Sequence, residues 1–550
     1  MKTKQNRGNL KHRLLSGIGR YAMFNKPLAT AAVTGVFALA FSQNAFALYQ
    51  NQGTYDGNNY SINLTTTLEY STAYRVNNPS AILAGPTNAN GNDGDSNLRH
   101  GIVSNQLEAL PVFDVKYGDF GFHLSAEFYL NTVYLQRNQN NQPGTINQYA
   151  PANNTDYTTA TRNQNGEQSR VLDAFGDYNH TFADGQTVGI KIGRQTLLWG
   201  ESLFFTGNGI AAGQAPIDAV LALSTPNVQT QQVFLPVGQA VLTYSPGIGG
   251  LTFQAYYQFE YMHDNFEGVG SYFSSSDILD KGGQRIILGG GSYLYRAKDN
   301  IPPSGNGQFG AAVMDTFGAY DVGLYGLRYD DKAPEVYANF ASGKYNLVYP
   351  RDIQIFGASL GTTVDSTNLG FEVSGRRNMP LDSGLGIVTA ANPGNANSDP
   401  LYAVGDTLAA QASEIYVSPG IPLDPGGVTV ESEIEFNHVL NVTANKSDLA
   451  HGRQASAAAF QGVVEPTYYD VEPNLDVAFP VGFTYDVLGN SEIDPTMNHG
   501  TGSVNVGVQL TYRETWVAGL TYNDYLGAPN TSQNPLADRG YVTFNIEHTF

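Results

Sequence analysis

Several stretches of the chain alternate apolar and polar side chains for ten or more residues. In residues 60–71 the apolar row begins and ends with a tyrosine, at Tyr60 and Tyr70. Similar rows occupy 120–131, 251–261, 475–487, 503–513, 515–523 and 540–550. Strands of soluble proteins usually run about five or six residues, whereas a strand that crosses an outer membrane needs about nine to eleven. The length of these rows therefore predicts membrane-spanning β-strands.

Turn signals and long polar tracts divide the rows in a regular way. Short turns such as Asp184-Gly185 and Tyr117-Gly118-Asp119 separate neighbouring candidates. Shorter or noisier candidate strands lie at 110–117, 171–182, 187–195, 238–245, 321–329, 335–341, 345–349, 353–362, 368–376 and 432–443. Long polar tracts cover 77–106, 136–168, 262–320, 377–431 and 444–474.

Short turns on one side and long loops on the other are typical of outer-membrane barrels. The pattern predicts an all-β fold, a transmembrane antiparallel β-barrel of about 14–18 strands with long extracellular loops. Strand 540–550 should close the barrel against 60–71. A secreted β-helix or sandwich is the alternative, but its alternation should break after about five or six residues.

The amino end has the features of a secretory signal peptide. Seven Lys or Arg and no Asp or Glu occur in residues 1–47, with an apolar stretch at 27–41 and the cleavage pattern Ala45-Phe46-Ala47. Cleavage near Ala47 leaves residues 48–550 as a single barrel domain. This portion holds 22 basic and 49 acidic residues, a formal charge of −27. Nucleic acid is then not an expected partner, since phosphate binding requires positive charge.

Few classes of chemistry are compatible with the composition. The chain has no cysteine, which excludes disulfides and thiolate chemistry. No zinc-helix motif or phosphate-binding glycine loop occurs. We therefore expect neither an enzyme nor a bound cofactor or metal.

Strand parity places charged side chains inside the barrel, where they either line a selective path or bond to one another. The predicted lumen charges are Glu69, Glu127, Glu260, Glu372, Glu547, Lys191, Arg376 and Arg513.

Residues 193–237 form an apolar segment, broken by glycine and proline, that follows strand 187–195. If exposed, this segment would present a large apolar patch to water, so we expect it to fold into the lumen as a plug or as a substrate-contacting constriction. The candidate contact residues are Arg194, Trp199, Glu201, Phe204, Phe205, Asn208 and Asp218.

This segment resembles the bacterial outer-membrane family called domain of unknown function 1302. The matching motifs are Gly193-Arg194-Gln195, Trp199-Gly200-Glu201-Ser202, Asn208-Gly209-Ile210, Pro216-Ile217-Asp218 and Leu235-Pro236-Val237. A second matching block runs from Tyr349 to Leu381. The resemblance implies an outer-membrane barrel of a Gram-negative bacterium, with envelope exporters of hydrophobic compounds as candidate partners.

The last strand resembles the carboxy-terminal signal that barrel-assembly machinery recognises. Its signal residues are Phe544, Ile546 and Phe550, and His548 is a departure in the lipid-facing row. Besides that machinery, outer-membrane lipid and lipopolysaccharide are the expected partners.

The functional hypothesis is a channel or transporter for a hydrophobic or amphipathic small molecule, gated by the 193–237 loop. A general cation-leaning porin and a plugged structural or adhesion barrel are the alternatives.

Overall fold

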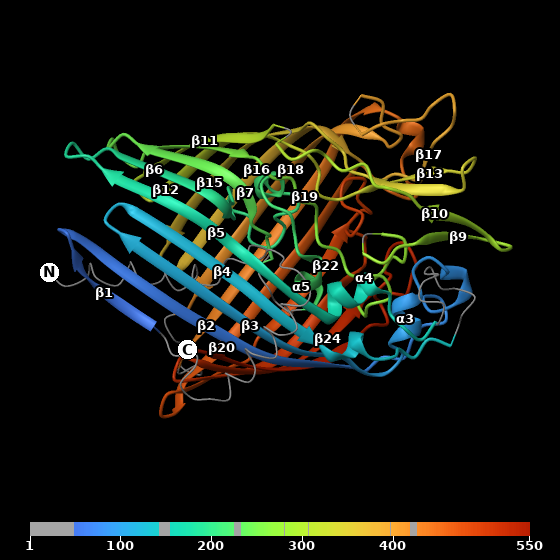
Figure 1. Cartoon of the computed structure of the whole chain (residues 1–550), viewed down its shortest axis with the longest axis horizontal. Coiled ribbons are helices and arrows are strands. Elements are labelled where there is room, and N and C mark those ends of the chain that lie inside the picture. The colour runs from blue at the N-terminus through green and yellow to red at the C-terminus, as the bar shows by residue number, and fades with distance from the viewer. Residues whose placement is uncertain are drawn as a thin grey trace.

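The computed structural model describes residues 49–141, 154–224, 233–279, 281–305, 307–396, 398–418 and 426–550. The expected signal peptide and its cleavage site lie outside the described residues. One antiparallel barrel accounts for most of the described chain, with short turns at one end and long loops at the other (Figure 1).

Within the described residues the wall has 18 strand positions, one of them shared by β21 and β22. The first nine are β2 (Asn58–Arg75), β3 (Gly101–Tyr117), β4 (Phe120–Asn131), β5 (Glu167–Thr181), β6 (Thr187–Gln195), β7 (Val237–Ser245), β8 (Thr252–Gln258), β11 (Gln308–Phe317) and β12 (Tyr320–Tyr329). The others are β15 (Ile353–Val364), β16 (Thr367–Pro380), β18 (Val404–Val417), β19 (Gly427–Ala444), β20 (Ser456–Glu472), β21 (Leu475–Ala478) with β22 (Val481–Leu488), β23 (Gly502–Tyr512), β24 (Trp516–Leu526) and β25 (Tyr541–Thr549). This confirms the predicted transmembrane barrel.

The last strand closes the barrel against the first, as predicted. β25 pairs with β2 from Thr67↔Thr549 to Arg75↔Tyr541, and the Phe550 N–H donates to the Thr66 carbonyl at 2.9 Å. β1 (Tyr49–Tyr55) pairs with the other half of β2, where β25 does not reach. Closure leaves no exposed strand edge within the apolar part of the wall.

Alternate residues of each strand face outward and form an apolar belt. On β12 and β15, Leu324 and Phe356 are 65% and 58% exposed, while their neighbours Tyr325 and Ile355 are buried. This period of two is what a barrel needs when lipid lies on one side of its wall and the lumen on the other.

The long loops carry a second, smaller sheet. Its strands are β9 (Arg285–Gly289), β10 (Ser292–Arg296), β13 (Glu335–Asn339), β14 (Lys344–Val348) and β17 (Gly386–Ile387). The candidates at 335–341 and 345–349 therefore belong to this accessory sheet and not to the wall.

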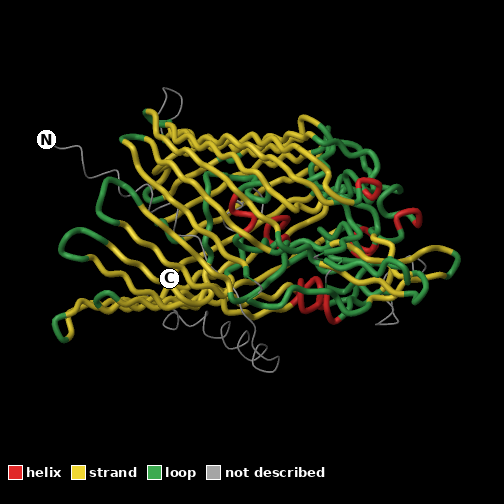
Figure 2. The backbone as a smooth tube through the Cα atoms, turned by 90° about the horizontal axis from the view of Figure 1, so that it is seen from above, coloured by secondary structure: helices red, strands yellow, loops and turns green. Residues whose placement is uncertain are grey.

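The helices are short and lie in the long loops. They are α3 (Asp93–Asn97), α4 (Thr159–Thr161), α5 (Ala219–Ser224), η1 (Pro86–Asn88), η2 (Thr132–Leu135), η4 (Arg162–Gly166), η5 (Ile210–Gly213) and η7 (Lys446–Asp448). Among the described residues, none of the helices has the length and apolar character to span a membrane. In Figures 1 and 2, which view the barrel from two sides, loop and helical segments are seen between the strands of the near and far walls.

Candidate functional site

The segment between β6 and β7 crosses the lumen. It leaves the wall after Gln195 and returns at Val237, with residues 225–232 outside the described part. Its hydrogen bonds reach β16, β18 and β19, which lie on the opposite side of the wall in the strand order. We call residues 196–224 and 233–236 the crossing loop.

Glu433 on β19 is the main anchor of the crossing loop. Its Oε2 accepts three successive backbone N–H groups, from Leu203 at 3.1 Å, Phe204 at 2.5 Å and Phe205 at 2.9 Å. The three donors converge on this one carboxyl oxygen. The side chain of Glu433 therefore holds the backbone of residues 203–205 against β19.

Glu372 on β16 provides a second anchor. Its two oxygens accept the backbone N–H groups of Glu201 at 2.9 Å and Ile210 at 2.6 Å. Gly200 has φ +97°, and a Cβ at this position would overlap the Glu372 carboxylate. The glycine of the Trp-Gly-Glu-Ser motif is thus required both by the backbone conformation and by the close approach.

Donors on the same wall hold the loop carbonyls. Arg376 donates to the carbonyls of Gly207 at 3.2 Å and Gly209 at 2.8 Å. The Gln411 side chain donates to the Phe205 carbonyl at 2.6 Å. Asn208 Nδ2 donates to Glu435 Oε1 at 3.2 Å. The predicted lumen charges Glu372 and Arg376 therefore face inward, and they bind the loop.

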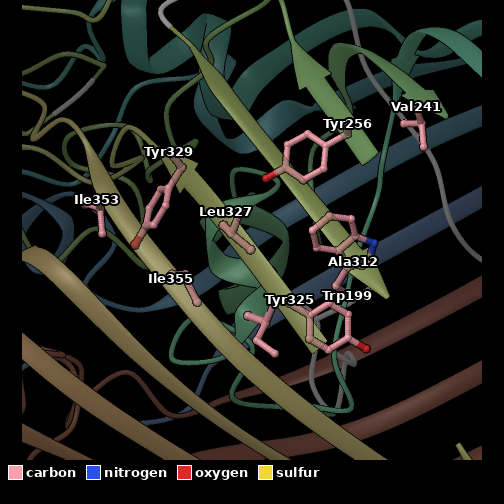
Figure 3. Packing of buried hydrophobic residues seen from close by; sticks show 10 residues of the cluster. Trp199, Val241, Tyr256, Ala312, Tyr325, Leu327, Tyr329, Ile353 and Ile355 are labelled. Atoms are coloured by element: carbon pink, nitrogen blue, oxygen red, sulfur yellow. The ribbon is translucent and has the colours of Figure 1, made fainter. Parts of the chain in front are cut away.

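The apolar side chains of the crossing loop pack into the wall. Trp199 is 5% exposed, and its ring lies 5.1 Å from Tyr256 and 5.7 Å from Tyr325 (Figure 3). Its Nε1 donates to Gln254 at 2.6 Å. Ile210 is fully buried in the same cluster.

A second apolar contact lies farther along the wall. Leu203 and Phe204 are buried against Val463, while Phe205 is half-buried and Glu201 is exposed. The predicted apolar contact residues Trp199 and Phe204 therefore anchor the loop, and Glu201 is the exposed side chain among the predicted contact residues.

Asp218 connects the crossing loop to other parts of the lumen. It caps α5 by accepting the N–H groups of Val220 and Leu221. It also pairs with Arg170 at 2.9 Å, and Arg170 in turn pairs with Glu127 at 2.8 Å. The predicted charges Glu127 and Asp218 thus share one arginine on β5.

A second segment, residues 259–279 after β8, spans the long-loop end of the barrel and reaches β25 on the other side. Within it Tyr272 and Phe273 pack on Tyr541 with ring centroids 6.1 and 5.2 Å apart. The Arg539 guanidinium donates to the Tyr272 and Ser274 carbonyls.

The same arginine holds a buried ion cluster. Arg539 pairs with Asp95 of α3 at 3.2 Å, and Asp95 also pairs with Arg75 at 2.8 Å, all three side chains having no exposed surface. We call 259–279, α3 and the 527–540 loop the lid. The Asn265 side chain donates to Asp218 at 3.0 Å, so lid and crossing loop are in direct contact.

Two of the predicted lumen charges are placed differently from the expectation. Arg513 lies in the turn between β23 and β24 with φ +52° and an exposed side chain, so its prediction as a lumen residue is wrong. The strand ends at Tyr512, and strand parity does not extend into a turn. Glu260 follows the end of β8 and pairs with Arg194 at 3.0 Å at the root of the loop.

Sequence reasoning missed the anchors Glu433, Glu435 and Gln411. Glu433 and Glu435 alternate with apolar residues in the candidate strand 432–443. This alternation could have identified them as side chains that face the lumen. Their role depends on pairing of β18 with β19 and on a loop more than two hundred residues earlier. In the described residues no group of three or more His, Cys, Asp or Glu side chains is arranged to hold a metal ion.

The model of one protein family matches residues 28–550, almost the whole chain. The chain belongs to the family of proteins of unknown function DUF1302. Two of its motifs, Trp199-Gly200-Glu201-Ser202 and Asn208-Gly209-Ile210, contain the loop residues that meet Glu372 and pack in the Trp199 cluster. No curated protein matches the chain.

Solved structures give distant similarities. The chain is similar to Acinetobacter baumannii OccAB2 (11% identity, 89% of this chain and 98% of that chain, TM-score 0.42). It is also similar to Pseudomonas aeruginosa OpdK with vanillate (12%, 88% and 98%, 0.40) and to Salmonella typhi OmpF in complex with daunomycin (10%, 91% and 100%, 0.34).

Proposed function

We propose that this DUF1302 protein is an outer-membrane channel for small solutes, narrowed by the crossing loop. The observation that carries the proposal is a set of hydrogen bonds that hold one loop across the lumen. Glu372 and Glu433 accept backbone N–H groups of this loop, and Arg376 and Gln411 donate to its carbonyls. An 18-stranded barrel is wide enough to enclose an aqueous path. A loop fixed across it by several charged anchors acts as a constriction of constant shape and not as a freely moving gate.

The wall around the path favours cations or neutral solutes. Glu69, Glu108 and Glu547 stand in register on three neighbouring strands. Glu201 is exposed on the crossing loop, and Glu431 and Glu465 are half-buried on β19 and β20. Carboxylates that line a narrow low-dielectric path raise the local concentration of cations.

An amphipathic solute is the second candidate. Leu197, Leu198 and Phe205 on the crossing loop are only half-buried, so they offer some apolar surface next to the polar path. An apolar surface with a few placed polar groups is typical of small-molecule sites. The buried side chains Trp199, Phe204 and Ile210 do not add to this surface.

The proposal is tested by conductance and reversal potential of the purified protein in planar bilayers under a potassium chloride gradient. We expect small, steady currents with cation preference, and a weaker preference in Glu201→Gln. Glu514→Gln is the matched control, because Glu514 is exposed in the turn after β23. Absence of current would instead support the plugged structural barrel, and anion preference would contradict the acidic path. An apolar molecule that co-purifies and blocks the current would favour the amphipathic solute.

A further inference from the structure

The outer surface of the barrel carries arginines at the long-loop end of its apolar belt. Arg328 on β12 pairs in register with Gln354 on β15, and Gln354 pairs with Arg377 on β16. These three positions continue the outward rows that contain the exposed Leu324 and Phe356. β12 and β16, the two strands that flank β15, thus each place a guanidinium above lipid-facing apolar side chains.

Alternation along β16 separates the roles of two adjacent arginines. Arg376 is buried and holds the crossing loop from inside. Arg377 is exposed on the opposite face, and no ion pair of Arg377 occurs within the described ranges. A solute in the lumen therefore cannot reach Arg377.

A third arginine lies beside this pair. Arg351 precedes β15, and the Asn378 side chain donates to its carbonyl at 2.8 Å, which holds it next to Arg377. The Arg351 Nη2 donates to Asn300 at 3.1 Å and to the Ile301 carbonyl at 3.4 Å, while its Nε is buried and has no acceptor among the residues that the structure describes. We call Arg328, Arg351 and Arg377 the rim arginines.

The rim arginines leave a local excess of positive charge on an acidic protein. Asp352 pairs with Arg328 and compensates one of the three charges. Asp330 is buried behind them and accepts the Asp352 N–H at 3.1 Å. With both carboxylates counted against the three arginines, the group keeps one positive charge, although residues 48–550 have a formal charge of −27.

We propose that the rim arginines bind the phosphate groups of a phosphorylated glycolipid, lipid A, in the outer leaflet. Long loops mark the extracellular end of such barrels, so the rim lies at the level of outer-leaflet headgroups. Guanidinium groups bind phosphate through paired charged hydrogen bonds. Acyl chains of the same molecule would then lie against Phe356 and Leu324, which favours a lipid over free phosphate.

The test measures lipid binding to the purified full-length protein in detergent by native mass spectrometry. The probes are bisphosphorylated lipid A and its dephosphorylated form. The variants are Arg377→Gln, whose exposed side chain leaves folding intact, and the double variant Arg351→Gln/Arg377→Gln. Lys344→Gln, at an exposed position at the start of β14 in the accessory sheet, is the matched control, and heat-modifiable gel migration confirms that each barrel is folded.

We expect the wild type to bind the phosphorylated lipid about tenfold more tightly than the dephosphorylated one. Arg377→Gln should reduce this ratio, the double variant should abolish it, and Lys344→Gln should preserve it. Equal binding of both lipids by the wild type would overturn the proposal. An equal loss in Lys344→Gln would also overturn it, because the effect would then reflect net charge alone.

Discussion

Gly200 shows how one residue sets the position of the crossing loop. Its φ of +97° is costly for other residues, and any side chain would displace the Glu372 carboxylate. We predict that Gly200→Ala weakens loop docking by about 1–3 kcal/mol. Undocked openings in single-channel recordings should become about five- to a hundredfold more frequent.

Gly207 provides the control for this substitution. A Cβ at Gly207 meets nothing within 4 Å, and its backbone does not have a positive φ. Gly207→Ala should leave the recordings unchanged. If both variants behaved alike, the loop would not be held by the Glu372 contact.

Strand parity correctly predicted which way side chains point inside the strands, but it failed for residues beyond the strand ends. Glu372 and Arg376 face inward as expected because both lie in the middle of β16. Arg513 lies in a turn and Glu260 beyond a strand end, where alternation has no meaning. His548, the predicted departure, stacks on Trp516 at 4.1 Å and thus replaces an aromatic residue.

At the scale of elements, the sequence predicted most wall strands and missed three. β11, β18 and β20 lay inside tracts interpreted as loops. On β18 the outward row contains Ala410 and Ala412, which pair with Val373 and Phe371. Alanine is small and only weakly apolar, so the outward and inward faces of β18 differ little in hydrophobicity and the alternation is hard to detect. The apolar surface at this place comes mainly from the paired residues of β16. The crossing loop was predicted correctly from its apolar composition, but its anchors needed the strand order.

The lid contains a carboxyl group that titrates near neutral pH. Burial raises the pKa of Glu267 to about 7 from 4.5, while hydrogen bonds from Ser271 and Asn165 oppose the shift. The folded lid therefore binds this proton more tightly than the opened lid, and lid stability falls as the pH rises through about 5 to 7.

We predict that amide hydrogen exchange of residues 266–279, corrected for the intrinsic rate, becomes faster between about pH 5 and 7, by up to about tenfold per pH unit. Burial also raises the pKa of Asp277 in the lid to about 7, so Glu267→Gln should reduce this dependence and Glu267→Gln/Asp277→Asn should flatten it. A pH dependence that persists unchanged in the double variant would assign it to another group of the lid.

At the scale of the whole molecule, closure of the barrel depends on the end of the chain. The Phe550 backbone pairs with Thr66, and its ring lies 4.3 Å from His548. We predict that deleting Phe550 reduces the heat-modifiable protein recovered from the outer membrane. His548→Phe keeps the aromatic stack and should assemble like the wild type. Normal assembly of the deletion variant would show that the terminal residue is dispensable.

The anchoring of the crossing loop has a consequence for the order of biogenesis. Glu372 and Glu433 come 162 and 230 residues later in the chain than the loop residues Ile210 and Leu203 that they hold. If the chain is exported from its amino end, as the predicted signal peptide implies, the apolar side chains of the loop reach the periplasm before the later strands that bind them. Exposed apolar segments of this kind promote aggregation. The chain should therefore need a periplasmic chaperone until its last third has been exported. Insertion that begins with the carboxy-terminal strands would place β16 and β19 in the membrane before the loop docks on them.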